Sequence, residues 1–136
     1  DYLKAFIMAL KAHYKQKDKS GKPYILHPLN VALRVKSKKA KVVALLHDVL
    51  EDSDKFSIEN FIFLDESQKE ALLLLTHNKN VPYMDYIQLI SKNEIAKEVK
   101  IQDLIQNLNL GRLKSIKEKD ISRTKKYINA LEILIK

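Results

Sequence analysis

The scarcity of turn-forming residues is the feature of this sequence that most restricts its fold. Only two glycines and three prolines occur among 136 residues, and tight β-hairpin turns depend on residues of this kind. A sheet built from hairpins is therefore not expected. Hydrophobic residues make up 46% of the chain and charged residues 31%, which is typical of a globular protein. The sequence predicts an all-α protein.

Hydrophobic residues recur at helical spacing along most of the chain, and polar stretches with glycine or proline separate the repeats. A chain of this length builds one core, so a single domain over residues 1–136 is expected. The pattern favours a compact bundle of about seven to eight helices. The predicted helices cover residues 2–16, 28–36, 40–51, a short segment capped by Ser57, 67–76, 82–91, 94–110 and 118–135.

The first and last predicted helices each carry an apolar stripe. These stripes are expected to face the core, and Gly111 is expected to end the helix of residues 94–110. The stripes consist of Leu3, Phe6, Ile7, Leu10 and Tyr14 in the first helix, and of Ile121, Ile128, Leu131 and Ile135 in the last.

Composition also restricts the partners and the compartment. The chain has no cysteine, which excludes disulfides and thiolate metal sites. No apolar run approaches the roughly 18 residues of a membrane-spanning helix, and the first residues do not resemble a signal peptide. A soluble, cytoplasmic protein without a membrane partner is expected.

The net charge of +8 at pH 7 comes mainly from lysines that are spread along the whole chain. Lysine clusters such as residues 36–41 have no interleaved aromatic side chains on which bases could stack. Nucleic acid is therefore not the expected partner, and the charge favours an anionic small substrate instead. The sequence does not predict an oligomeric state.

Residues 42–52, VVALLHDVLED, place four ionisable groups on an otherwise apolar helix. If the helix is continuous, His47 lies above Glu51 and Asp48 above Asp52, because residues four apart share a face. Burying bare carboxylates costs several kcal/mol each. A divalent cation would remove that cost, and imidazole with carboxylate suits Mn²⁺, Fe²⁺ or Zn²⁺ better than Ca²⁺.

Two side chains are too few for a tight metal site, so further ligands are expected from elsewhere in the chain. His27 precedes a proline near the start of a predicted helix, and Asp103 is a polar residue among apolar neighbours. Asn107 lies one turn beyond Asp103 on the same face. The candidate ligand set is therefore His27, His47, Asp48 and Asp103, around one metal, with His13 and His77 left outside it.

Four blocks of the sequence resemble a known superfamily. HYKQKDKSGKPYILHPLNVA, ALLHDVLED, LLLLTHNK and VKIQDLIQN lie between about His13 and Tyr127 and together resemble the HD-domain metal-dependent phosphohydrolases. Within that superfamily the chain is most similar to the (p)ppGpp hydrolases, both the hydrolase domains of long Rel/Spo proteins and the small stand-alone alarmone hydrolases. The resemblance implies an HD-type helical bundle. It also implies hydrolysis of the 3′-diphosphate of guanosine alarmones, which yields pyrophosphate and GDP or GTP.

The resemblance also assigns roles to individual residues. It implies that His27, His47, Asp48 and Asp103 bind one Mn²⁺, and that Glu51 and Asp52 handle the water that this metal activates. Lys19 would lie along the nucleotide, Asn107 would hold its sugar or base, and Thr76 with Lys79 would lie in a phosphate-binding loop. Arg123 and Tyr127 would bind the diphosphate. The implied substrate-binding residues are Lys19, Thr76, Lys79, Asn107, Arg123 and Tyr127.

Asp18 is the clearest departure from the family pattern. The family usually has an arginine directly before the lysine at position 19, where it stacks on guanine, and an aspartate cannot make that contact. Three alternatives stand beside alarmone hydrolysis, and Asp18 motivates the first of them. They are an HD phosphohydrolase for another nucleotide or nucleotide cofactor phosphate, a non-catalytic nucleotide-binding sensor, and a basic nucleic-acid-binding protein.

Overall fold

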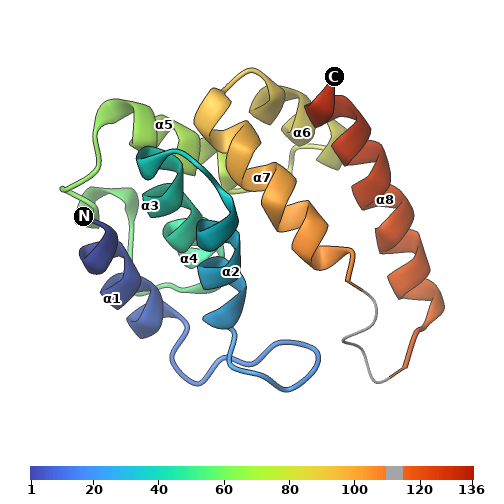
Figure 1. The fold of residues 1–136 in the computed structure, drawn as a ribbon, viewed down its shortest axis with the longest axis horizontal. Helices are drawn as coiled ribbons and strands as arrows, with labels where there is room; N and C mark the ends of the chain where they lie inside the picture. The colour runs from blue at the N-terminus through green and yellow to red at the C-terminus, as the bar shows by residue number, and fades with distance from the viewer. Residues whose placement is uncertain (110–114) are drawn as a thin grey trace.

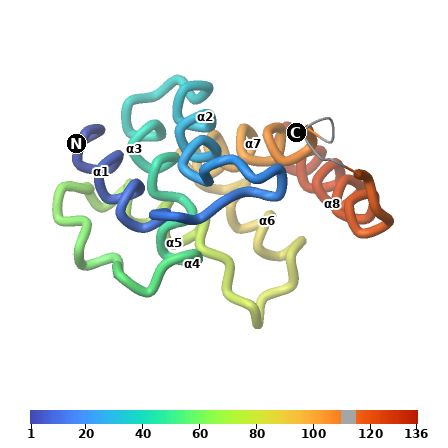
Figure 2. Tube along the Cα trace, turned by 90° about the horizontal axis from the view of Figure 1, so that it is seen from below, coloured from blue at the N-terminus to red at the C-terminus, as the bar shows by residue number. Residues whose placement is uncertain are grey.

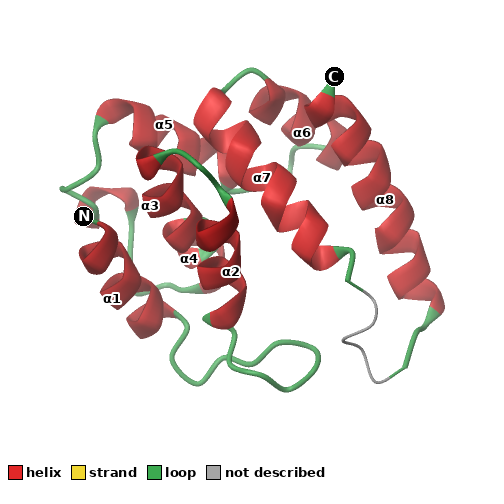
Figure 3. Cartoon of the chain, in the orientation of Figure 1, coloured by secondary structure: helices red, strands yellow, loops and turns green. Residues whose placement is uncertain are grey.

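The regular structure of the protein is helical, as the shortage of turn residues predicts. The computed structural model describes residues 1–109 and 115–136, and within them Figures 1 and 3 show helices and loops without strands. The helix predicted for residues 94–110 ends earlier, at Asn107, and Gly111 lies outside the described residues. The elements are α1 (Tyr2–Ala12), α2 (Leu26–Arg34), α3 (Lys38–Leu46), α4 (Val49–Asp52), the 3-10 helix η1 (Ile58–Asn60), α5 (Glu66–Leu75), α6 (Tyr83–Ser91), α7 (Glu94–Asn107) and α8 (Glu118–Ile135).

Helix α3 lies at the centre of a group of helices formed by α1, α2, α5 and α7. Helices α1, α2, α5 and α7 all pack against it, so every residue from Val42 to Leu46 is buried. This explains why the stretch VVALL has no polar face. A helix that is surrounded on all sides has no face to expose to water.

Helices α6 and α8 pack against each other and against α7. Helix α7 therefore contacts both the helices around α3 and the pair α6 and α8. Figures 1 and 2 show α1 and α8 at opposite ends of the molecule. No helix in the described residues is long and apolar enough to cross a membrane.

The apolar stripes predicted for α1 and α8 are only partly buried. Helix α1 packs through Ala5 and Ala9, and α8 packs through Ala130 and Leu134. Each outer helix has neighbours on one side only, and small alanines let it approach them closely. The prediction was therefore wrong for several residues, which are exposed: Leu3, Ile7, Leu10, Tyr14, Ile121, Ile128 and Ile135.

Helix α1 is also shorter than predicted. It ends at Ala12 and not at residue 16, and Lys15 has a positive φ of 65°, a left-handed conformation that no helix continues through. Helix α2 begins at Leu26, so Pro28 lies within its first turn. The chain between these helices, residues 13–25, is a loop that extends towards α7 and α8 (Figure 2).

The predicted helix of residues 40–51 is interrupted. Helix α3 ends at Leu46 and α4 begins at Val49, so His47 and Asp48 lie in a turn between two helices. The expected stacking of these two residues on Glu51 and Asp52 along one continuous helix was therefore wrong. The carbonyl of Ala44 near the end of α3 accepts hydrogen bonds from the backbone N–H and the Nδ1 atom of His47, contacts that the spacing of apolar residues does not reveal.

Candidate metal centre

Two histidines and an aspartate from three helices meet in the interior. His27 lies in α2, His47 follows α3, and Asp103 lies in α7; all three are buried. Their candidate ligand atoms lie within 4.8 Å of one another. The Oδ1 atom of Asp103 is 2.7 Å from the Nε2 atom of His27 and 3.4 Å from the Nε2 atom of His47.

Asp48, the fourth expected ligand, lies beside this group. Its Oδ2 atom is 3.2 Å from the Nε2 atom of His47 and 3.9 Å from that of His27. The same oxygen accepts a hydrogen bond of 2.5 Å from the hydroxyl of Tyr24. Tyr24 fixes the orientation of this carboxylate, and the residue pattern had not indicated this contact.

The hydrogen-bonding state of His47 fits a metal ligand. Its Nδ1 atom lies 2.5 Å from the carbonyl oxygen of Ala44, which can only accept a hydrogen bond, so Nδ1 carries the hydrogen. The Nε2 atom is buried and has no hydrogen-bond partner of good geometry among the described residues, and it faces the carboxylates of Asp48 and Asp103 at 3.2 and 3.4 Å. A divalent cation would displace the proton from this nitrogen and bind it together with the two carboxylates.

The pKa values of this cluster favour paired charges. Burial raises the pKa of Asp103, but the Lys100 ammonium and the two imidazoles outweigh burial and hold it well below its usual range. Burial likewise opposes ionisation of Asp48, yet mainly His47 lowers its pKa to about 2. Burial lowers the pKa of His47, but the neighbouring carboxylates raise it well above its ordinary value. The cluster therefore contains two carboxylates that stay ionised.

Lys100 belongs to this charge balance, although the sequence pattern gave it no role. Its Nζ atom lies 2.9 Å from the Oδ2 atom of Asp103, one turn away on α7, and 5.3 Å from the centre of the Tyr86 ring. The spacing of three residues between Lys100 and Asp103 is the signal that could have indicated this pair.

The two acidic residues of α4 are exposed, and each accepts a hydrogen bond from a distant segment. Glu51 accepts one of 2.5 Å from the backbone N–H of His77, and Asp52 accepts one of 3.2 Å from the side-chain amide of Gln16. Desolvation of the two carboxyl groups raises their pKa values, while these hydrogen bonds act in the opposite direction. Both carboxylates are therefore held in place and are better proton acceptors than ordinary ones.

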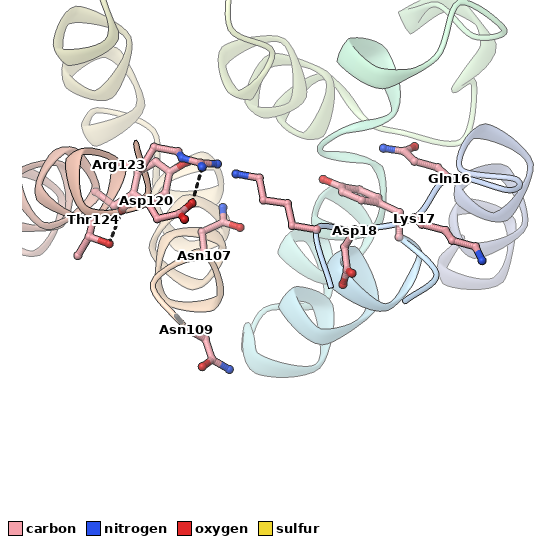
Figure 4. A pocket seen from close by; sticks show the side chains of 11 residues that line it. Gln16, Lys17, Asp18, Asn107, Asn109, Asp120, Arg123 and Thr124 are labelled. Carbon is pink, nitrogen blue, oxygen red and sulfur yellow. Dashed lines mark hydrogen bonds and ion pairs between the residues drawn. The ribbon is translucent and has the colours of Figure 1, made fainter. Parts of the chain in front are cut away.

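A cleft of about 270 Å³ adjoins the metal centre (Figure 4). Three of its lining residues donate hydrogen bonds to carboxylates of the site. Gln16 donates to Asp52 and Tyr24 to Asp48. Asn107 donates to Asp103 at 3.2 Å. Its lining includes four of the six expected substrate-binding residues. The lining residues are Gln16, Lys17, Asp18, Lys19, Tyr24, Asn107, Asn109, Asp120, Arg123, Thr124 and Tyr127.

Two expected substrate-binding residues lie elsewhere. Thr76 ends α5, where its hydroxyl donates to the carbonyl of Leu72 at 2.9 Å, and Lys79 is exposed on the following loop. Neither is among the described residues that line the cleft. Both lie close in sequence to His77, whose backbone N–H donates a hydrogen bond to Glu51. Their loop therefore contacts the site at Glu51.

The carboxylate of Asp18 is bound within its own loop. Its Oδ1 atom accepts hydrogen bonds from the backbone N–H and hydroxyl of Ser20, at 2.9 and 2.7 Å, and from the backbone N–H of Lys22 at 3.0 Å. In Figure 4 its side chain points away from Asn107 and Arg123. Asp18 therefore organises the loop, and its charge is directed away from the far wall of the cleft.

Known proteins share this fold and parts of this sequence. No family model matches the chain. A guanosine-3′,5′-bis(diphosphate) 3′-pyrophosphohydrolase of Aquifex aeolicus is 47% identical over 55 residues, which are 38% of this chain and 8% of that protein. The corresponding protein of Borreliella burgdorferi is 40% identical over 76 residues, 53% of this chain and 11% of the relative. These relatives confirm the resemblance to the (p)ppGpp hydrolases that the sequence blocks predicted.

The fold of nearly the whole chain is similar to that of a solved structure. A solved structure of a metazoan orthologue of SpoT that hydrolyses ppGpp superposes with a TM-score of 0.78 at 22% identity, over 98% of this chain and 84% of that one. The chain spans only 8–11% of the length of the two curated hydrolases described above. It therefore corresponds in length to a small part of those proteins.

Proposed function

We propose that this chain hydrolyses the 3′-diphosphate of (p)ppGpp and releases pyrophosphate and GDP or GTP. The observation that carries the proposal is the buried His27–His47–Asp103 cluster, with Asp48 beside it, at the wall of a cleft that Lys19 and Arg123 line. The resemblance to the (p)ppGpp hydrolases supports the substrate class. The positive side chains suit an anionic nucleotide.

In this proposal His27, His47, Asp48 and Asp103 hold one divalent ion, and Mn²⁺ is the proposed metal. Such an ion acidifies water and neutralises charge on phosphoryl oxygens. The donor set supports this assignment, because it combines two imidazoles with two ionised carboxylates and leaves the Nε2 atom of His47 without a hydrogen-bond partner of good geometry among the described residues.

The chain's own side chains carry the remaining steps. Glu51 and Asp52 accept the proton of the attacking water, since both are held near the cluster and have raised pKa values. Lys19 and Arg123 contact the phosphates, and Asn107 holds the nucleoside next to Asp103. Tyr127 lines the same cleft. Thr76 and Lys79 lie outside the cleft lining, and in this proposal their loop moves towards the phosphates from beside Glu51.

The test is pyrophosphate release from ppGpp in the presence of Mn²⁺. The wild-type chain is expected to release it, and Asp48→Ala is expected to lose nearly all of this activity. Glu51→Gln and Asp52→Asn should lower kcat by about 100-fold each while the bound metal is retained. Full turnover by both carboxamide variants would refute the proposed role of these acids.

A second candidate is hydrolysis of another nucleotide, and Asp18 is the observation that favours it. The arginine that stacks on guanine in the family is absent here, and the carboxylate that replaces it is bound within its loop. Turnover of ppGpp, ppApp, dGTP and NADPH should therefore be compared. Equal rates on guanine and adenine substrates would favour this candidate, and nucleotide binding without turnover of any of them would favour a sensor.

A further inference from the structure

His13 is a buried histidine outside the metal centre, and it begins a chain of hydrogen bonds that ends at Asp52. Its Nδ1 atom lies 2.8 Å from the Oε1 atom of Gln16. The Nε2 atom of the same glutamine lies 3.2 Å from the Oδ2 atom of Asp52, which is 36 residues further along the chain. The three side chains therefore form a continuous path into the proposed catalytic site.

The donors and acceptors of this path have one consistent direction. The Asp52 carboxylate accepts, so the amide nitrogen of Gln16 must donate to it, and the amide oxygen of Gln16 must face His13. Because that oxygen can only accept, the Nδ1 atom of His13 carries the hydrogen. His13 thereby selects the amide orientation in which Gln16 can bind a carboxylate.

His13 is itself held firmly. Its backbone N–H donates to the carbonyl of Ala9 at the end of α1, and its carbonyl accepts from the N–H of Gln16. Its ring lies 4.8 Å from the ring of Tyr24, whose hydroxyl binds Asp48. The backbone N–H of Tyr24 donates to the carbonyl of Gln16 at 2.9 Å, so both ends of the segment 16–24 are attached to the site.

We infer that His13 and Gln16 are positioning residues that hold the Asp52 carboxylate for proton transfer, an inference that rests on the proposed function. The Gln16–Asp52 bond is exposed to solvent, so it contributes little to folding stability. Its consequence is geometric. An unheld aspartate on the last residue of a four-residue helix would sample several rotamers, and only some of them point to the attacking water.

The test compares variants that remove or keep the donor to Gln16. Gln16→Met and His13→Leu are expected to lower kcat for pyrophosphate release by about tenfold, with KM changed by less than about twofold. His13→Asn keeps an N–H donor near the position of Nδ1 and should recover most of the rate. Tyr14→Met, at an exposed neighbouring residue, is the control and should behave as the wild type.

Two further measurements separate positioning from other roles. On an Asp52→Asn background, Gln16→Met should cause no additional loss, because the carboxylate it holds is already gone. A KM effect with unchanged kcat would make Gln16 a substrate contact, and a matching fall in Tm would make the pair structural. Either result, or additive losses in the double variant, overturns the inference.

A measurement that does not depend on catalytic activity can test the inference separately from the proposed function. In the ¹⁵N-labelled protein without metal or substrate, the side-chain amide resonances of Gln16 should shift in His13→Leu and in Asp52→Asn but not in Tyr14→Met. If the wild type releases no pyrophosphate and these shifts occur, the proposed function fails and the positioning pair stands. Absence of the shifts refutes the pair whatever the activity.

Discussion

Lys100 is the largest of the favourable charge contacts of the buried Asp103, which His27 and His47 also contact. Its ammonium group contacts Asp103 at 2.9 Å, and both side chains are largely buried. Removing one partner of a buried ion pair leaves the other charge uncompensated, which is far more costly than losing a surface pair.

The first prediction follows from this pair. Lys100→Met should lower the free energy of unfolding of the metal-free protein by about 3 kcal/mol, and added Mn²⁺ should restore part of it by neutralising Asp103. Thermal unfolding with and without Mn²⁺ measures both effects. Lys97→Met is the matched control, because Lys97 forms only a surface pair with Glu94 one turn earlier. Equal losses in the two variants would contradict the assigned role of Lys100.

The sequence pattern indicated histidines and aspartates as candidate metal ligands, because few other side chains bind metals. It did not indicate residues whose role depends on contacts with distant parts of the chain. His27, His47, Asp48 and Asp103 were predicted because imidazoles and carboxylates in apolar surroundings need a partner. Gln16, Tyr24 and His77 are ordinary polar or aromatic residues in the sequence. Their importance comes from single contacts with Asp52, Asp48 and Glu51 across 24 to 36 residues of chain.

At the scale of the elements, helix starts were predictable and helix breaks were not. Ser37, Asp65 and Asn93 each cap a helix by accepting a hydrogen bond from the backbone three residues later, and such caps have a sequence signature. The break between α3 and α4 has no glycine or proline. It arises where His47 and Asp48 face the metal centre, which is a tertiary cause.

The second prediction concerns the cap of α5. The Asp65 carboxylate accepts hydrogen bonds from the backbone of Gln68, from Ser67 and from Lys39, and its pKa is lowered chiefly by the contact with Lys39. Asp65→Ala should therefore lower the free energy of unfolding by about 1 kcal/mol at pH 7.

The pH dependence of this effect has a definite sign. Because the folded state lowers the pKa of Asp65, its contribution is complete above the unfolded value of about 3.9. It shrinks as pH falls below that value and is lost fully only below the lowered pKa of the folded state. Denaturant unfolding between pH 7 and pH 3 should show the difference between wild type and Asp65→Ala shrinking. Asp65→Asn keeps a capping oxygen and should lose less stability at pH 7. A constant difference across this range would contradict the prediction.

At the scale of the whole molecule, the candidate metal centre joins helices that are distant in the sequence. Its four residues come from α2, from α7 and from the turn between α3 and α4, and α7 packs both against the helices around α3 and against α6 and α8. A bound ion would therefore link the interior of the group around α3 to the helix that also contacts α6 and α8.

The third prediction is a stability effect of the metal. Mn²⁺ at 100 times its Kd should raise the free energy of unfolding by about 2.7 kcal/mol, and a chelator should reverse this increase. Differential scanning calorimetry of the wild type and Asp103→Asn measures it, and the variant should respond much less. Glu94→Gln, at the exposed start of α7, is the control and should respond as the wild type does. An unchanged Tm in the wild type would remove the case for a metal in this cluster.

The hydrogen bonds of Asp18 have a consequence for any attempt to change nucleotide preference. They close the loop of residues 18–22 on itself before any ligand arrives, so binding there requires little loss of conformational entropy. Replacing Asp18 with arginine would add a side chain able to stack on a base but would remove the bonds that preorganise the loop. Base preference and loop order are therefore coupled at this position, and a gain in one is obtained at the expense of the other.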